Sequence, residues 1–97
     1  MKYQVFNKEQ QKQIAETLEL IKETLRNAKK TEMSLKGKVN EEFKNAKYLE
    51  ERHGAENSLT QIAWRTFSWK SDDLDALQSR IEELEDAERF NQRLLKL

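Results

Sequence analysis

The stretch that decides the fold is residues 58–97, SLTQIAWRTFSWKSDDLDALQSRIEELEDAERFNQRLLKL. Its aliphatic residues recur at intervals of three and four, which places them on one stripe of an α-helix; they are Leu74, Leu77, Ile81 and Leu84. Such a stripe needs a partner, and residues 7–53 supply a helical stretch of similar length. We therefore expect one all-α domain over residues 1–97, an antiparallel helical hairpin of two long helices.

The first helical arm, residues 7–53, has an apolar stripe that keeps its phase through Gly37. At about 100° per residue the stripe stays within a sector of roughly 80°; its members are Ile14, Leu18, Ile21, Leu25, Ala28, Leu35, Val39, Phe43 and Ala46. A true break would reset this phase, so the pattern predicts a continuous helix. The alternative is a three-helix bundle broken near Gly37.

Capping residues predict where the helices begin and end. Asn7 followed by Gln10 has the spacing of an N-cap and its reciprocal partner, and residues 1–6 before it are expected to form an extended arm. A glycine, Gly54, follows the cationic end of the first arm, as is typical of a helix C-terminus. Residues 54–58 then form the turn, and Asn57 or Ser58 caps the second arm.

The second arm, residues 58–97, contains two further irregularities. A second cap-like sequence begins at Ser71, so a kink is possible near Lys70. Towards the C-terminus the apolar positions also move round the helix, to Ala87, Phe90, Leu94 and Leu97. Two apolar faces on one helix predict more than one neighbour. We expect two hairpins to pair into a four-helix or coiled-coil bundle, or the hairpin to assemble on another protein.

The charges of the two arms are opposite in sign. The whole chain has 18 Lys and Arg and 18 Asp and Glu, but residues 1–53 carry a net +3 and residues 54–97 a net −3. Opposite signs favour pairing of the two arms with each other. The zero total gives no general attraction to nucleic acid or to anionic membranes.

Groups that could carry out catalysis are scarce. The chain has no cysteine and one histidine, His53, and no serine lies in a recognisable nucleophile turn. We therefore expect no enzymatic activity, no metal site and no cofactor. The lack of cysteine is compatible with a reducing compartment, and no segment approaches the roughly 18 apolar residues of a spanning helix. The expected location is the cytoplasm.

An aromatic block near the turn is the first candidate for a partner-binding surface. On an ideal helix, Phe67 points in the direction of Leu77 and Ile81, whereas Trp64 points nearly the opposite way. Tryptophan beside arginine is common among interface anchors, although packing inside the hairpin is the simpler explanation. The partner-binding hypothesis comprises Trp64, Arg65, Trp69, Tyr48 and Phe90. The function expected from it is that of a small regulatory, inhibitor or chaperone-like protein that self-associates or binds another protein.

A basic stripe on the first arm is the alternative candidate. Its cations fall within a sector of roughly 120° on an ideal helix; they are Lys22, Arg26, Lys29, Lys30, Lys36, Lys44 and Lys47. These side chains could pair with the acidic second arm. They could instead bind phosphate groups of a nucleic acid or a small nucleotide.

Overall fold

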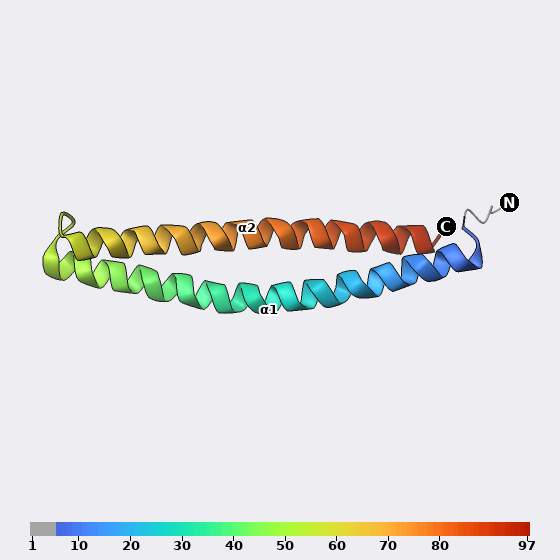
Figure 1. Cartoon of the computed structure of the whole chain (residues 1–97), viewed down its shortest axis with the longest axis horizontal. Coiled ribbons are helices and arrows are strands. Elements are labelled where there is room, and N and C mark those ends of the chain that lie inside the picture. The colour runs from blue at the N-terminus through green and yellow to red at the C-terminus, as the bar shows by residue number, and fades with distance from the viewer. Residues whose placement is uncertain (1–5) are drawn as a thin grey trace. The chain divides into compact units, whose positions relative to one another are not determined.

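The computed structural model describes residues 6–97, and these residues form two helices. Helix α1 comprises Lys8–His53 and helix α2 comprises Ser58–Leu95. No strand occurs in this part of the chain. The predicted all-α helical hairpin is therefore confirmed (Figure 1). The predicted extended arm falls on residues 1–6, of which residues 1–5 lie outside the described part.

Local sequence explains the helix ends. At the start of α1, the Asn7 side-chain oxygen accepts from the Gln10 N–H at 2.8 Å, and the Gln10 side-chain oxygen accepts from the Asn7 N–H at 3.1 Å. This is the predicted reciprocal cap. The Asn57 side-chain oxygen accepts from the Leu59 N–H at 2.9 Å, so Asn57 is the N-cap of α2. Gly54 ends α1 with a φ of 85°, a conformation that disfavours any side chain.

Each helix is continuous through the position where the sequence allowed an interruption, as predicted for α1 at Gly37. Helix α1 continues through Gly37, so the three-helix alternative is wrong. Helix α2 likewise continues through Lys70 and Ser71 without a new helix start. An isolated glycine costs a helix only about 1 kcal/mol relative to alanine, and a cap-like sequence does not end a helix whose neighbouring turns are packed.

The chain divides into two compact units, and each contains a segment of both helices. Unit 2 is Lys30–Ser79, which includes the turn; unit 1 contains the described residues before and after it, 6–29 and 80–97. Within each unit the α1 segment runs antiparallel to the α2 segment (Figure 1).

The helices pack through a seam whose positions alternate at spacings of three and four, the coiled-coil pattern. All seam residues are buried or half-buried. In α1 they are Gln11, Ile14, Leu18, Ile21, Leu25, Ala28, Glu32, Leu35, Val39, Glu42, Ala46 and Leu49. In α2 they are Thr60, Ala63, Phe67, Lys70, Leu74, Leu77, Ile81, Leu84, Glu88, Asn91 and Leu95.

One member of the predicted α1 stripe does not belong to this seam. Counting from Val39 by three and then four leads to Glu42 and Ala46, so Phe43 lies beside the seam and is 39% exposed. Glu42 was not predicted as a seam residue, because the prediction used apolar residues alone and Glu42 is charged. Its charge is matched across the seam by Lys70, at 2.9 Å.

Candidate functional site

Three aromatic rings gather in unit 2, beside the seam. The centroid of the Trp64 ring is 5.7 Å from that of Phe43 and 5.6 Å from that of Phe67, with interplanar angles of 72° and 86°. Phe43 and Phe67 are themselves 5.6 Å apart. Edge-on rings at these separations attract each other beyond their burial. The cluster therefore joins α1 to α2, since Phe43 belongs to the first helix and the other two rings to the second.

The structure agrees with the simpler explanation for Trp64, packing inside the hairpin, and not with the outward direction measured on an ideal helix. Trp64 is half-buried and packs on Phe43 of α1. The prediction measured its direction against Leu77 and Ile81, about two heptads further along α2. Side-chain directions on an ideal helix rotate by about 20° per heptad relative to a coiled-coil repeat. A reference residue two heptads away therefore gave the wrong direction for the Trp64 side chain. The nearby seam residue Ala63, which immediately precedes Trp64, is the correct reference.

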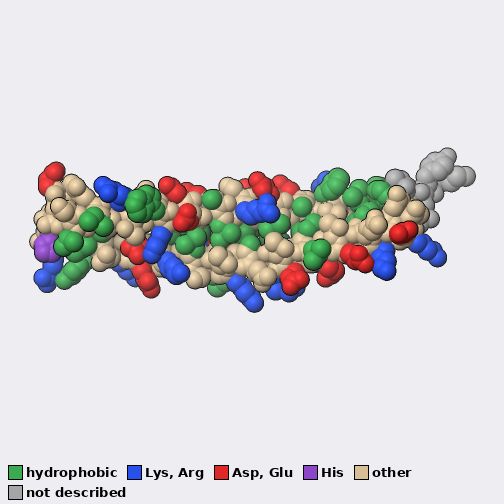
Figure 2. Space-filling model, in the orientation of Figure 1, with side chains coloured by type: hydrophobic (Ala, Val, Ile, Leu, Met, Phe, Trp, Pro, Cys, Tyr) green, Lys and Arg blue, Asp and Glu red, His purple; other side chains and the backbone are tan. Residues whose placement is uncertain are grey.

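The other tryptophan has a different environment. Trp69 is 62% exposed, and two aliphatic residues of the same helix are also exposed, Leu59 at 58% and Ile62 at 55%. Together with the half-buried Thr66 they occupy alternating steps of three and four along α2. We call Leu59, Ile62, Thr66 and Trp69 the unit 2 stripe. Hydrophobic side chains are visible at the surface near the turn, where the purple His53 marks the end of α1 (Figure 2).

The spacing of the apolar residues in the sequence is a signal for this stripe. Leu59 and Ile62 were not predicted as site residues, although their spacing to Trp69 follows the same alternation as the seam. Each stripe residue stands immediately before a seam residue in the chain. A search for the one face that is directed at the partner helix does not find a second apolar periodicity beside it.

Tyr48, Arg65 and Phe90 are all at the surface. Tyr48 is 54% exposed, and the guanidinium carbon of Arg52 lies 5.2 Å from its ring centroid. Arg65 is exposed in unit 2, next to the half-buried Trp64. Phe90 is 59% exposed and belongs to unit 1. The structure thus assigns four of the five predicted contact residues to unit 2, and only Trp64 among them is packed inside the hairpin.

The basic residues of α1 are divided between the units. Lys22, Arg26 and Lys29 lie in unit 1, and the remaining four predicted cations, Lys30, Lys36, Lys44 and Lys47, lie in unit 2. Lys29 pairs with Glu85 of α2 at 3.8 Å, in agreement with the expected attraction between a basic first arm and an acidic second arm.

Two other contacts of basic residues differ from that expectation. Lys22 is 4.0 Å from Glu19 of its own helix, and the Lys47 Nζ atom lies 6.0 Å from the Phe43 ring centroid. The pair between Glu42 and Lys70 also has the opposite polarity, with the acid on α1. Arm charge alone therefore does not predict which residues pair.

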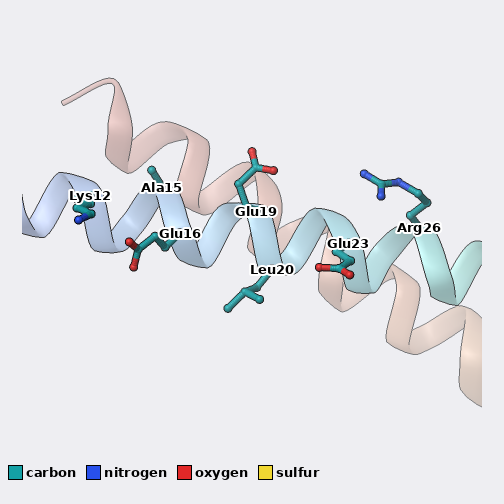
Figure 3. Close-up of a pocket in the computed structure, with 7 residues that line it drawn as sticks. All are labelled: Lys12, Ala15, Glu16, Glu19, Leu20, Glu23 and Arg26. Carbon is teal, nitrogen blue, oxygen red and sulfur yellow. The ribbon is translucent and has the colours of Figure 1, made fainter.

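An open groove of about 640 Å³ runs along α1 in unit 1 (Figure 3). All of its lining residues come from this one helix: Lys12, Ala15, Glu16, Glu19, Leu20, Glu23 and Arg26. Sites for small ligands usually surround most of the ligand's surface. A groove with walls from a single helix does not do this, and its mixed charges converge on no common point.

The described residues contain no group of three or more His, Cys, Asp or Glu side chains that could hold a metal ion. Residues 6–97 also contain no helix that is long and apolar enough to cross a membrane.

Comparison of the chain with protein-family models, with curated proteins and with solved structures found no match. The exposed apolar side chains of α2 are therefore the feature on which a functional argument rests.

Proposed function

We propose that this protein is a non-enzymatic protein–protein interaction module that acts through self-association and through the exposed surface of unit 2. The observation that supports this proposal is the unit 2 stripe, where Leu59, Ile62 and Trp69 each leave more than half of their surface exposed. Scattered exposed apolar residues are ordinary, whereas a contiguous set marks an interaction surface. Tyr48, also exposed in unit 2, adds a second aromatic of the type enriched at interfaces.

Energetics favour covering this stripe. Full burial of a Leu, Ile or Trp side chain contributes roughly 1.5–3 kcal/mol. The hairpin seam buries less apolar surface than a fully apolar seam would, because polar side chains occupy five of its positions besides the ion pair: Gln11, Glu32, Thr60, Glu88 and Asn91. A second layer of helices would add the apolar burial that the seam lacks.

The proposed role is that of a small regulatory, inhibitor or chaperone-like helical protein. A binding surface on a rigid helix suits such a role, because little conformational entropy is lost when the partner docks. We propose the cytoplasm as its location, with which the lack of cysteine is compatible.

Sedimentation velocity over a range of concentrations tests the self-association. We expect the weight-average mass to rise with concentration, and Ile62→Glu to abolish the rise. Met33→Glu is the matched control, because Met33 is 74% exposed on α1 and is not part of the stripe. A strictly monomeric protein at high micromolar concentration would contradict self-association.

A second candidate function is binding of phosphate groups, in nucleic acid or in a nucleotide. The observation favouring it is that Lys30, Lys36, Lys44 and Lys47 are all exposed on α1 of unit 2. Binding through these cations would weaken steeply with salt. Fluorescence anisotropy with labelled DNA and RNA, together with thermal shifts measured with nucleotides, tests it; the quadruple Lys→Gln variant should lose any binding observed.

A further inference from the structure

The apolar surface of unit 2 extends from α2 onto α1. The contact between Phe43 and Trp64 marks one side of the hairpin, and each of these residues immediately follows a seam residue. One residue before and one residue after a seam position differ by about 200° around a helix. Residues that precede seam positions therefore lie on the opposite side of unit 2, on both helices. They include the unit 2 stripe of α2 and, on α1, Tyr48, which is 54% exposed.

Two arginines lie among these apolar side chains. Arg65 follows Ile62 by three residues and precedes Trp69 by four, which are the spacings of neighbours on a helix surface. The guanidinium of Arg52 lies over the ring of Tyr48, 5.2 Å from its centroid. Both arginines are exposed, and neither takes part in the ion pairs that the described residues form. We call the unit 2 stripe together with Tyr48, Arg52 and Arg65 the unit 2 face.

Acidic residues are missing from the part of α2 that forms this face. Residues 57–71, NSLTQIAWRTFSWKS, contain no Asp or Glu, although the chain has 18 of them. The cations of this segment are Arg65 and Lys70, and Lys70 is already paired across the seam. Two acids near the turn, Glu51 and Glu56, form no ion pair with either arginine of the face. The unit 2 face is therefore a locally positive surface on an arm whose net charge is −3.

We infer that the occupant of the unit 2 face is an acidic amphipathic helix of another protein. Its apolar residues cover the unit 2 stripe, and carboxylates beside them pair with Arg65 and Arg52. The inference rests on the proposed partner-binding function of unit 2 and specifies the chemistry of the partner. It does not depend on self-association.

The shape of the face favours a helix as the partner. A peptide that binds as a strand adds to the edge of a sheet, and residues 6–97 form no strand. The unit 2 stripe instead offers side chains at steps of three and four, which the same repeat on a second helix packs against. From Leu59 to Trp69 the stripe is about 15 Å long, a length that about three turns of a partner helix cover.

The charge of the face favours carboxylates on that helix. A partner that covers Ile62 and Trp69 also withdraws Arg65, which lies between them, from part of its water. Burial of a cation is unfavourable unless an opposite charge meets it. A carboxylate accepts two parallel hydrogen bonds from a guanidinium, whereas a neutral or basic partner leaves the arginine unpaired.

A displayed library of designed peptides tests this chemistry with the full chain as bait. Each peptide has about 20 residues, enough for an isolated helix to form, with Leu at steps of three and four. The positions beside the leucines carry Glu, Gln or Lys at random. We expect the enriched peptides to carry Glu at these positions. Enrichment of Lys, or no preference among the three residues, would overturn the inferred chemistry.

Charge exchange identifies the arginine that the carboxylates meet. In fluorescence anisotropy with an enriched peptide, Arg65→Glu should weaken binding by about tenfold, and Glu→Lys changes in the peptide should restore it. Lys36→Glu is the matched control, because Lys36 is also exposed in unit 2 but follows the seam residue Leu35. Its effect should stay below about twofold, since exposed charges are screened with distance. Failure of the Lys-containing peptide to regain affinity for the Arg65→Glu chain would contradict this pairing.

The apolar part of the face has its own test. Trp69→Ala should weaken binding of the same peptide by about tenfold. Met33→Ala should leave binding unchanged, because Met33 is 74% exposed but follows a seam residue of α1. Unchanged binding to the Trp69→Ala chain would show that the peptide docks elsewhere, and would overturn the inference. Circular dichroism confirms that each variant is helical. A second copy competes for the same stripe, so affinities are measured at concentrations where the chain is monomeric in sedimentation.

The remaining outcomes separate this inference from the proposed function. Enriched peptides without a charge preference would leave unit 2 as a protein-binding surface and overturn only the acidic partner. A library without binders would overturn the inference, while self-association in sedimentation would still stand. Binding to vesicles of phosphatidylcholine and phosphatidylserine, lost in Arg65→Glu and without any enriched peptide, would assign the face to a membrane surface. A chain that binds no peptide and stays monomeric would contradict the inference and the proposed function together.

Discussion

The Nζ atom of Lys70 lies 2.9 Å from Oε1 of Glu42, and the pair spans the seam of unit 2 with side-chain exposures of 35% and 24%. Both residues occupy positions that apolar side chains fill in the adjacent turns, such as Val39 and Leu74. A slip of α2 by one heptad would oppose Glu42 to an apolar residue. We therefore expect the ion pair to specify the register of the helices more than it stabilises them.

Removal of one member of this pair should destabilise the hairpin. Lys70→Leu leaves the Glu42 carboxylate partly buried without a cation, and we expect a loss of about 1–2 kcal/mol in the free energy of unfolding. The double variant Glu42→Leu/Lys70→Leu should be at least as stable as the parent chain. Urea unfolding followed by circular dichroism gives both values, and an unchanged midpoint for Lys70→Leu would contradict the prediction.

The two glycines should respond in opposite directions to alanine. A Cβ atom at Gly37 meets nothing within 4 Å, so Gly37→Ala should stabilise α1 by about 1 kcal/mol through helix propensity. Gly54 has a φ of 85°, so Gly54→Ala should cost about 1–2 kcal/mol. Thermal unfolding of the two variants under the same conditions should show melting temperatures on either side of the parent value.

Thr60 should tolerate loss of its hydroxyl group. The side chain is fully buried, and its Oγ1 atom has no hydrogen-bond partner among the described residues. Thr60→Val keeps the shape and removes the unsatisfied group, so we expect a gain of about 1 kcal/mol. Thr60→Ser, which keeps the hydroxyl and deletes the methyl group, is the control and should be less stable than the parent.

The two tryptophans should differ in their importance to the monomer. Trp64→Ala removes the ring that contacts Phe43 and Phe67, and should cost about 3 kcal/mol. Trp69→Ala should change the free energy of unfolding by less than about 0.5 kcal/mol in dilute solution, because the side chain is largely exposed. Equal losses for the two variants would show that Trp69 also packs within the hairpin.

The sequence predicted the fold well because helix formation depends here on strong local signals. Cap residues such as Asn7 and Asn57, and the regular apolar spacing, act over a few residues and are visible in the chain. The complete set of seam residues was harder to predict from the sequence. Glu42 and Lys70 occupy core positions only because each neutralises the other, and a pattern search restricted to apolar residues does not find such a pair.

The candidate surface was predicted only in part for a related reason. Trp69, Tyr48 and Phe90 were identified as candidates and are exposed. For Trp64, the ideal-helix direction pointed away from the hairpin because a small angular error per turn accumulates along a long helix, whereas the simpler explanation, packing inside the hairpin, agrees with the structure. Leu59 and Ile62 have a spacing to Trp69 that is visible in the chain, but their exposure depends on which flank the partner helix covers, and packing decides that.

The position of the aromatic cluster also bears on the order in which the molecule assembles. Phe43 and Trp64 are about 20 residues apart along the chain, whereas Ile14 and Asn91, which line one groove of unit 1, are nearly 80 apart; loop closure favours the nearer pair by about 1 kcal/mol. We expect nucleation at the turn, followed by zipping of the helices towards the termini. The free ends would then fray first, and a partner that binds there would meet the most easily opened part of the chain.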